Sequence, residues 1–267
     1  MTHLTQPPVF HDQNSLITDL VIPCVDVAGG RTQTPAGIPG LHDPSDAVAV
    51  AAKYADDGAN KLFIDVIDPW ERVSDHLPPL LRRLKGTGLC LIVSVGHGVI
   101  PSVDDAGFLL EAGADVISAS TSVIESPEVV KEAISRYGGG RFNIVINSRP
   151  REAGRWTVYT HNGSRKTPVD SVELARELGH LGVGTLLPNA VDREGVGQGY
   201  DLALTRTVAE ASGLPVIASG GCGTLEHLTQ ALGKGGATYV LVNSMVHSGK
   251  YSIAGIRDAL YAASPFR

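Results

Sequence analysis

Two apolar runs of this chain contain or end in a polar residue that could take part in acid–base chemistry. LVIPCVDV (residues 20–27) carries Asp26, and FNIVIN (142–147) ends at Asn147. A carboxylate at such a position can act as a general acid or base when burial tunes its pKa. An amide does not exchange a proton near neutral pH and can only donate and accept hydrogen bonds. Two stretches of the same form therefore offer different chemistry.

Asp65 and His97 are the next candidates, and each has a structural alternative. Asp65 lies near the end of KLFIDVI (61–67), where the sequence supports a structural and a functional role equally. His97 interrupts the glycine-rich segment SVGHG (94–98), which is more typical of a ligand-facing histidine than of a core histidine. For Asp26, the alternative is a structural carboxylate that bonds to turn amides. The residue types indicate acid–base chemistry without excluding these structural roles.

Four short segments rich in glycine, serine or threonine follow apolar runs at matching intervals. They are SVGHG (94–98), SASTS (118–122), ASGGCG (218–223) and VNSMV (242–246). Glycine lets the backbone approach an oxyanion closely, and free backbone N–H groups supply hydrogen-bond donors. Ordinary turns between strands and helices are also glycine-rich, which is the alternative interpretation. Because the segments form two matched pairs, we favour two phosphate pockets and a long substrate with a phosphate at each end.

Eight apolar runs predict the strands that must position these residues. Between them lie segments such as DPSDAVAVAAKYADDG, with apolar residues at helical spacing. Strands that are apolar on both faces and separated by helices indicate a parallel sheet. Eight such units in one domain predict a (β/α)8 barrel, with a doubly wound open sheet as the alternative. That alternative lacks a Gly-x-Gly-x-x-Gly motif after the first run. The predicted strands are residues 20–27, 61–67, 90–95, 115–120, 142–147, 184–189, 214–219 and 238–243.

The chain also repeats itself at about half its length. Residues 91–123 match residues 215–246 in the order strand, glycine-rich turn, helix, Gly-Ala step and strand. The strands of Asp26 and Asn147 are then the first strands of two similar halves. We therefore predict a barrel of two half-barrel repeats, with two similar phosphate sites opposed across its mouth.

Composition and charge narrow the class of protein. Of the 267 residues, 43% are hydrophobic and 19% charged, so the chain can bury a large core, and the net charge of -6 argues against nucleic acid as main partner. No run approaches the roughly 18 apolar residues of a membrane helix, and the first residues lack the features of a signal peptide. The scattered Cys24, Cys90 and Cys222 lack zinc-site spacing and predict inert thiols in a reducing compartment. We expect a cytoplasmic protein with an N-terminal extension (residues 1–18) and one barrel domain (19–267).

Longer motifs extend over nearly the whole chain, from residue 20 to about residue 262. They are IPCVDVAGGR (22–31), DPSDAVAVAAKYADDGANKL (43–62), SVGHG (94–98), EAGADVISASTSVIESP (111–127), WTVYTHNGSRKT (156–167), VDREGVGQGYD (191–201) and IASGGCGTLEHL (217–228). With these motifs the sequence resembles the cyclase subunit of imidazole glycerol phosphate synthase, of the histidine pathway, and its isomerase sister. The resemblance implies a half-barrel-duplicated (β/α)8 fold and no metal or organic cofactor. It also implies a bisphosphate substrate, a ribulose phosphate joined to an aminoimidazole carboxamide ribotide.

The resemblance implies that two carboxylates, at the ends of strands one and five, carry out the acid–base chemistry. Asp26 matches the first, whereas Asn147 stands where the second is expected, so the two-acid mechanism does not transfer unchanged. The family's basic residue in the first-strand loop falls at Thr34. The hydroxyl residue that ends strand six falls at Asn189, and the acid of the next loop becomes Glu194. We expect the catalytic residues to be Asp26, Asn147, Asn189, Glu194, Asp65 and His97.

The resemblance also assigns phosphate-binding residues. One asparagine of the family becomes Ser120, and Asn243 replaces a small residue, while the glycines after strand seven are kept. The expected phosphate-binding residues are Gly98, Ser120, Thr121, Ser219, Gly220, Gly221, Asn243 and Ser244.

In the family, ammonia from a glutaminase partner enters at the barrel bottom through a ring of two basic and two acidic residues. The corresponding positions here are Leu20, Lys61, Val116 and Thr185. One lysine, two apolar residues and a threonine cannot form a salt-bridged gate. A glutaminase partner is possible, but we expect it not to be engaged in the usual way.

Three functions remain open from the sequence. The favoured one is a diverged paralogue that acts on a ribosyl phosphate or bisphosphate by lyase, cyclase or isomerase chemistry, with Asp26 as the main acid–base group. It would serve a branch off histidine or nucleoside-type specialised metabolism. The second is a genuine cyclase subunit that tolerates the changes and uses free ammonia or a glutaminase. The third is a non-catalytic phosphate-binding or regulatory subunit, which the retention of Asp26 and Glu194 disfavours.

Overall fold

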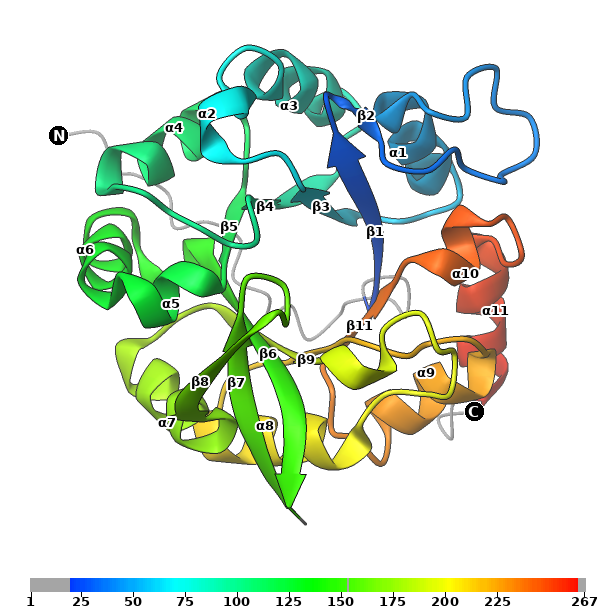
Figure 1. Ribbon diagram of the computed structural model, residues 1–267. Helices are drawn as coiled ribbons and strands as arrows, with labels where there is room; N and C mark the ends of the chain where they lie inside the picture. The colour runs from blue at the N-terminus through cyan, green and yellow to red at the C-terminus, as the bar shows by residue number, and fades with distance from the viewer. Residues whose placement is uncertain (1–19, 153, 264–267) are drawn as a thin grey trace, which may run out of the picture.

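The computed structural model describes residues 20–152 and 154–263. The predicted N-terminal extension, residues 1–18, lies outside the described residues. The fold is mixed α/β, with strands and helices that alternate along the chain and a long, mostly parallel sheet. Figure 1 shows the strands gathered around a centre, with the helices outside them. Among the described helices, none combines the length and the apolar character that crossing a bilayer requires.

Eight strands of the sheet coincide with the predicted apolar runs. They pair in parallel and in chain order, and β1 also pairs with the last strand, β11. Two isolated parallel bridges, Leu186 with Val216 and Asn189 with Ser219, connect the sixth of these strands to the seventh. The seventh run forms a strand over only two of its residues. The strands are β1 (Val21–Ala28), β3 (Lys61–Val66), β4 (Cys90–Val95), β5 (Val116–Ala119), β6 (Phe142–Glu152), β9 (Thr185–Ala190), β10 (Ile217–Ala218) and β11 (Tyr239–Val242).

Helices follow these strands, and several begin at a polar cap. Asp46 accepts a hydrogen bond from the Val48 amide, and Asp170 accepts one from the Val172 amide, so each satisfies a donor of the first helical turn. The longer helices are α1 (Ala47–Asp56), α3 (Leu77–Lys85), α4 (Val103–Ala112), α6 (Pro127–Tyr137), α7 (Ser171–Leu181), α8 (Leu202–Ser212), α9 (Leu225–Leu232) and α11 (Ile253–Ala263). The short ones are α2 (Trp70–Val73), α5 (Thr121–Glu125), α10 (Ser244–His247) and the 3-10 turns η2 (Gly139–Arg141) and η3 (Val191–Arg193).

Alternation along the strands divides the core in two. Side chains that face the helices join one large apolar cluster, while those on the opposite face form a smaller one. The smaller cluster consists of Ile22, Cys24, Phe63, Ile92, Val116, Leu187, Ile217 and Tyr239. Two residues further along several of these strands, toward their C-terminal ends, the same face becomes polar, as at Asp26 after Cys24. The inner apolar cluster therefore supports a polar layer at one end of the strands.

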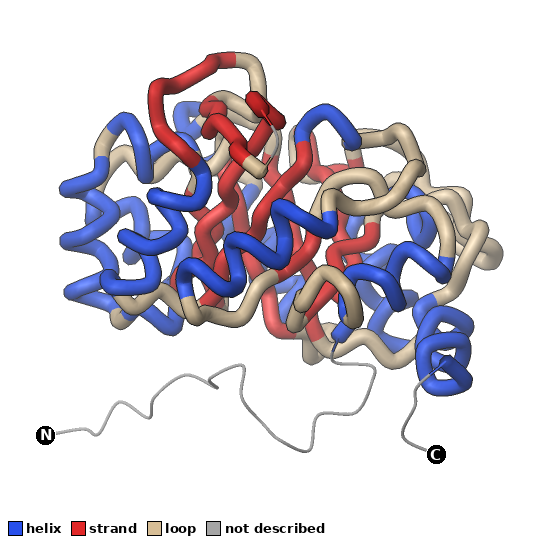
Figure 2. Tube along the Cα trace, turned by 90° about the horizontal axis from the view of Figure 1, so that it is seen from below, coloured by secondary structure: helices blue, strands red, loops and turns tan. Residues whose placement is uncertain are grey.

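The predicted end of the fifth strand at residue 147 is wrong, because β6 continues to Glu152. It does so by pairing with two antiparallel strands, β7 (Arg155–Thr160) and β8 (Arg165–Asp170), that the apolar pattern did not predict. A two-residue strand, β2 (Arg31–Thr32), likewise pairs with the end of β1. These additions mix polar and apolar residues and pair with segments close in sequence, so they lack the continuous apolar runs of the main strands. In Figure 2, strand segments extend past the helices at one end of the molecule.

Candidate functional site

A cavity of about 710 Å³ lies at the C-terminal ends of the parallel strands. It is lined by every predicted catalytic residue and by every predicted phosphate-binding residue except Thr121. Parallel strands carry their C-terminal ends to one edge, which explains how residues so far apart in sequence come together. The predicted residues on its wall are Asp26, Asp65, His97, Gly98, Ser120, Asn147, Asn189, Glu194, Ser219, Gly220, Gly221, Asn243 and Ser244.

The Asp26 carboxylate is hydrogen-bonded to a residue near the C-terminal end of the chain. One of its carboxylate oxygens, Oδ2, accepts a hydrogen bond of 2.9 Å from the Asn243 side-chain amide. Its other oxygen, Oδ1, lies 3.6 Å from the Cys24 thiol. Burial and the neighbouring Asp26 carboxylate raise the pKa of Cys24 well above its ordinary value, so this cysteine stays a neutral thiol. Asp26 is thus oriented by neutral donors, and no cationic partner among the described residues ties up its charge.

The amides of the second half form a continuous hydrogen-bonded chain. Asn147 donates from Nδ2 to the Ser120 hydroxyl at 3.1 Å, and its Oδ1 accepts from Asn189 Nδ2 at 2.7 Å. The Ser219 hydroxyl donates to Asn189 Oδ1 at 3.0 Å. These four residues come from four neighbouring strands or strand ends, and all are buried. The Asn147 side chain is therefore held by hydrogen bonds on both sides. Because one of them joins it to Asn189, a shift of either side chain would move the other.

Glu194 joins the same network from the loop after β9. Its Oε1 accepts a hydrogen bond of 2.6 Å from Asn189 Nδ2. The side chain keeps exposed surface, yet desolvation of its carboxyl raises its pKa, and the Asp26 charge adds to this effect. The hydrogen bond from Asn189 and the nearby Arg149 charge act in the opposite direction. A carboxyl group with a raised pKa keeps its proton to a higher pH than an ordinary glutamate does, which suits a general acid.

Asp65 is the third carboxyl group of the cavity. It lies beside Asp26 in the strand register and is hydrogen-bonded to the Ser94 side chain. Burial raises its pKa to about 6, with smaller contributions from the Asp26 and Glu194 charges, while the bond to Ser94 lowers it. Three mutually repelling carboxyl groups in one cavity favour protonation of at least one of them.

The raised pKa of Asp65 gives a testable effect on stability. The folded protein holds this proton over a pH range, from about 4 to about 6, in which the unfolded chain has released it. The free energy of unfolding of wild type therefore falls as the pH rises through this range. The Asp65→Asn variant has no carboxyl group at this position, so its free energy of unfolding does not fall for this reason. We expect the variant to be more stable than wild type at pH 8, by on the order of 2 kcal/mol, and equal to it at pH 4.

Urea unfolding at both pH values measures this difference. The exposed Asp56, changed to Asn, is the matched control and should show no pH-dependent difference from wild type. Equal urea midpoints for wild type and Asp65→Asn at pH 8 would contradict the assigned environment.

The predicted turns have the expected glycine conformations, with one exception. Gly220 and Gly221 have φ angles of 85° and 101°, a region that side-chain-bearing residues rarely adopt. His97 occupies the same region with φ of 64°, although it is not a glycine. Histidine adopts this region more readily than most residues, and residues in it cluster at active sites and ligand-binding segments.

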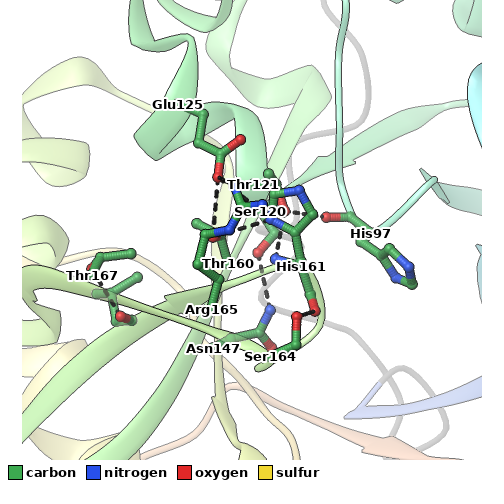
Figure 3. Close-up of polar contacts among 11 residues, drawn as sticks. His97, Ser120, Thr121, Glu125, Asn147, Thr160, His161, Ser164, Arg165 and Thr167 are labelled. Atoms are coloured by element: carbon green, nitrogen blue, oxygen red, sulfur yellow. Dashed lines mark hydrogen bonds and ion pairs between the residues drawn. The ribbon is translucent and has the colours of Figure 1, made fainter.

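Thr121 lies outside the cavity and has a different set of contacts. Its hydroxyl donates to the His97 carbonyl oxygen at 2.8 Å and accepts from the His161 amide at 3.0 Å. Figure 3 shows it between the turn of His97 and the hairpin of β7 and β8. Its hydroxyl therefore connects these two segments to each other.

The structure adds residues that the sequence did not suggest. Asn162, at the tip of the β7–β8 hairpin, lines the cavity, and the left-handed φ angles of His161 and Asn162 give the tip its sharp turn. His247 lines the opposite side, where its Nε2 lies 2.8 Å from the Thr34 carbonyl oxygen. The dipeptide Asn162-Gly163 is a hairpin signal that could have revealed the first of these. His247 ends a short helix, and nothing in its local pattern predicts its role.

The positions of the expected ammonia gate lie at the other ends of the strands. The Lys61 ammonium lies 5.3 Å from the centre of the Tyr239 ring. Thr185 donates to Asn143 Oδ1 at 2.8 Å, and Asn143 Nδ2 donates to the Ser118 hydroxyl at 2.9 Å. Val116 belongs to the inner apolar cluster. Three of these positions therefore take part in packing and buried hydrogen bonds.

Residues 20–252 match the sequence model of a family described as histidine biosynthesis protein. The match covers most of the chain and includes every strand that contributes to the cavity, as well as all of its lining residues.

Proposed function

The chain belongs to the histidine biosynthesis protein family, and from this premise we propose that it is an enzyme acting on a ribosyl phosphate or bisphosphate by acid–base lyase, cyclase or isomerase chemistry. Asp26 is the main acid–base group, and Glu194 is the second. The observation that carries this proposal is the presence of both carboxyl groups in one cavity with two pairs of glycine-rich or hydroxyl-rich turns. The reaction belongs to a branch off histidine or nucleoside-type specialised metabolism.

We also propose that the sheet closes into a (β/α)8 barrel built from two half-barrel repeats. The pairing of β1 with β11 and the bridges between β9 and residues 216 and 219 support closure. The repeat is supported by the polar residues at equivalent strand ends. Asp26 and Asn147 occupy one equivalent pair of positions, and Asp65 and Asn189 occupy the next. Carboxyl groups stand in the first half where amides stand in the second.

This division between the halves is the reason to propose a diverged reaction. A two-acid cyclisation needs a proton-exchanging group at residue 147, and an amide does not supply one. Asn147 is bonded on both sides, to Ser120 and to Asn189, so it is suited to orienting a substrate. The nearest carboxyl group in that network is Glu194, reached through Asn189. Acid–base work in the second half therefore falls to Glu194, and a genuine two-acid cyclase is the less supported alternative.

We propose that the enzyme needs no metal and receives no ammonia through the strand ends opposite the cavity. The packing of Lys61 against Tyr239 and the buried bonds of Thr185 support this second point. A glutaminase partner, if present, would engage the protein differently from the family's usual arrangement. We further propose that residues 19–267 form a single barrel domain and that residues 1–18 are an extension of it. We propose a cytoplasmic location for the protein.

The test is incubation of the full-length protein with individual ribosyl mono- and bisphosphates, with and without ammonium, while the mass of each compound is followed. We expect at least one of them to be converted, and inorganic phosphate to inhibit competitively because it occupies the same cavity. Failure of every ribosyl phosphate to bind or react, in a correctly folded preparation, would contradict the proposed function.

A further inference from the structure

We propose that Asn243 is a positioning residue for the Asp26 carboxylate, which it holds in the direction that proton transfer requires. This role differs from the phosphate binding that the sequence predicts for Asn243. The inference rests on the function proposed above, because it takes Asp26 as the main acid–base group. It adds a residue that acts on the reaction through Asp26 and not through its own contact with the substrate.

Asn243 reaches Asp26 because the last strand of the sheet lies beside the first, as Figure 1 shows. β11 and β1 pair in parallel, with Val242 opposite Pro23, and Asn243 follows directly after this pair. Side chains alternate along a strand, and Leu241 packs against the inner apolar cluster, so Asn243 continues the same face toward the cavity. Its amide therefore meets the Asp26 carboxylate, although the two residues are 217 positions apart in the sequence.

The Asn243 side chain is directed at Asp26 and not at its own helix. Asn243 directly precedes α10, a position where asparagine commonly accepts a hydrogen bond from an amide of the first turn. Here the side chain makes no such capping bond with the described residues, and Nδ2 instead donates to Asp26 Oδ2 at 2.9 Å. The Asn243 backbone carbonyl oxygen accepts from the amides of Val246 and His247, at 3.0 and 2.9 Å. The helix thus fixes the backbone of Asn243, while its amide points across to β1.

The segment that begins with Asn243 is also hydrogen-bonded to the loop that follows β1. The Gly37 amide donates to the His247 carbonyl oxygen at 2.8 Å. The imidazole of His247 contacts the same loop, because its Nε2 lies 2.8 Å from the Thr34 carbonyl oxygen. A side chain at Gly37 would collide with the Ser248 backbone, so the two segments pack directly against each other. These contacts keep the amide of Asn243 in place relative to β1.

Other described groups near Asp26 are less suited to orient its carboxylate. The Cys24 thiol lies 3.6 Å from Oδ1, and a thiol is a weak hydrogen-bond donor. The carboxyl groups of Asp65 and Glu194 are close enough to feel the Asp26 charge, and like charges repel without fixing a direction. The amide N–H of Asn243 is therefore the donor that decides where the Asp26 carboxylate points.

The second proposed acid–base group has the same kind of support. Asn189 Nδ2 donates to Glu194 Oε1 at 2.6 Å, just as Asn243 Nδ2 donates to Asp26. An amide suits this role because it donates a hydrogen bond and does not exchange a proton near neutral pH. It can orient a carboxylate without competing for the proton that the carboxylate transfers.

Two substitutions of Asn243 in the full-length protein test the inference. Asn243→Ala removes the donor, and Asn243→Leu removes it while it keeps most of the side-chain volume, which controls for a cavity left by alanine. Each is made in wild type and in Asp26→Asn, and urea unfolding verifies the fold. The measurements are kcat and KM with the ribosyl phosphate that wild type converts, and the Kd of inorganic phosphate by calorimetry. Asn60→Ala, at an exposed asparagine directly before β3, is the matched control and should leave all three unchanged.

We expect each substitution to lower kcat by about 10- to 100-fold, because a small displacement of a catalytic group is enough for a loss of this size. KM and the Kd of phosphate should stay within about twofold of wild type, since Asn243 acts through Asp26. In the Asp26→Asn background the same substitutions should change the residual turnover by less than about twofold, because the carboxylate that Asn243 orients is absent.

Three results would overturn the positioning role alone. They are an unchanged kcat in the wild-type background, a KM or phosphate Kd raised about tenfold or more, and an equal loss of kcat in the Asp26→Asn background. The second result would assign Asn243 to substrate binding. No turnover of any ribosyl phosphate by wild type would overturn the proposed function, and this inference with it.

Discussion

The Asp26→Asn variant is expected to lose turnover by about 10³-fold or more while it still binds phosphate ligands as wild type does. Asparagine retains an oxygen that can accept the hydrogen bond from Asn243, so the local geometry is kept. It does not exchange a proton, and general acid–base catalysis by one positioned group contributes typically about 10²- to 10⁴-fold. The measurement is kcat with the converted ribosyl phosphate, together with the Kd of inorganic phosphate.

The matched control for this variant is Asp56→Asn, which removes a carboxylate from the exposed end of α1, outside the cavity wall. It should leave both kcat and Kd unchanged. Wild-type turnover in Asp26→Asn would remove Asp26 from the mechanism. A joint loss of turnover and phosphate binding would show instead that its role is to shape the cavity.

The Glu194→Gln variant is expected to lower kcat/KM by about 10²-fold and to remove one ionisation from its pH profile. Glutamine can still accept the hydrogen bond from Asn189, so the amide network is preserved. The pKa of Glu194 is raised, mainly by desolvation, which keeps the carboxyl group protonated to higher pH than an ordinary glutamate. If it acts as the acid, the activity of wild type falls as the pH rises through that raised pKa.

This ionisation is found by measuring kcat/KM for wild type and variant between pH 5 and pH 9. A variant that retains the wild-type profile, or that loses less than about threefold in rate, would show that Glu194 is not the second acid–base group. Asp192→Asn, on an exposed neighbour in the same loop, is the control for a general change in loop charge.

Much of the fold could be predicted because the main strands are buried on both faces. Runs such as CLIVSV, which forms β4 over Cys90–Val95, are apolar enough to identify a strand and its limits. The β6–β8 region could not be predicted in the same way. Residues after Asn147 mix polar and apolar types, as in RWTVYT, and apart from Ser148, which also pairs with β9, they pair only among β6, β7 and β8. Neither their strand character nor the length of β6 therefore follows from a continuous apolar run.

The location of the candidate site could also be predicted from the sequence, but its connections could not. Asp26 and Asn147 were expected to lie together because polar residues at the ends of parallel strands share one edge, and the family resemblance added Glu194 to them. That Asn147 is bonded to Ser120 and to Asn189 depends on register between strands, which no single stretch of sequence specifies. Phosphate binding by Thr121 stays a prediction, and the contacts of its hydroxyl with the His97 carbonyl oxygen and the His161 amide could not be predicted.

The central claim is that this family scaffold keeps Asp26 but has lost the two-acid cyclisation at residue 147. The most direct test incubates wild type and the Asn147→Asp variant with the bisphosphate substrate of the family's cyclase and ammonium salt, and follows the products by mass. We predict that neither protein forms the cyclised imidazole product, because Asn189 and Thr34 differ from the family pattern together with Asn147. Formation of that product by wild type, or full ammonia-dependent activity restored by the single carboxylate of the Asn147→Asp variant, would contradict the account.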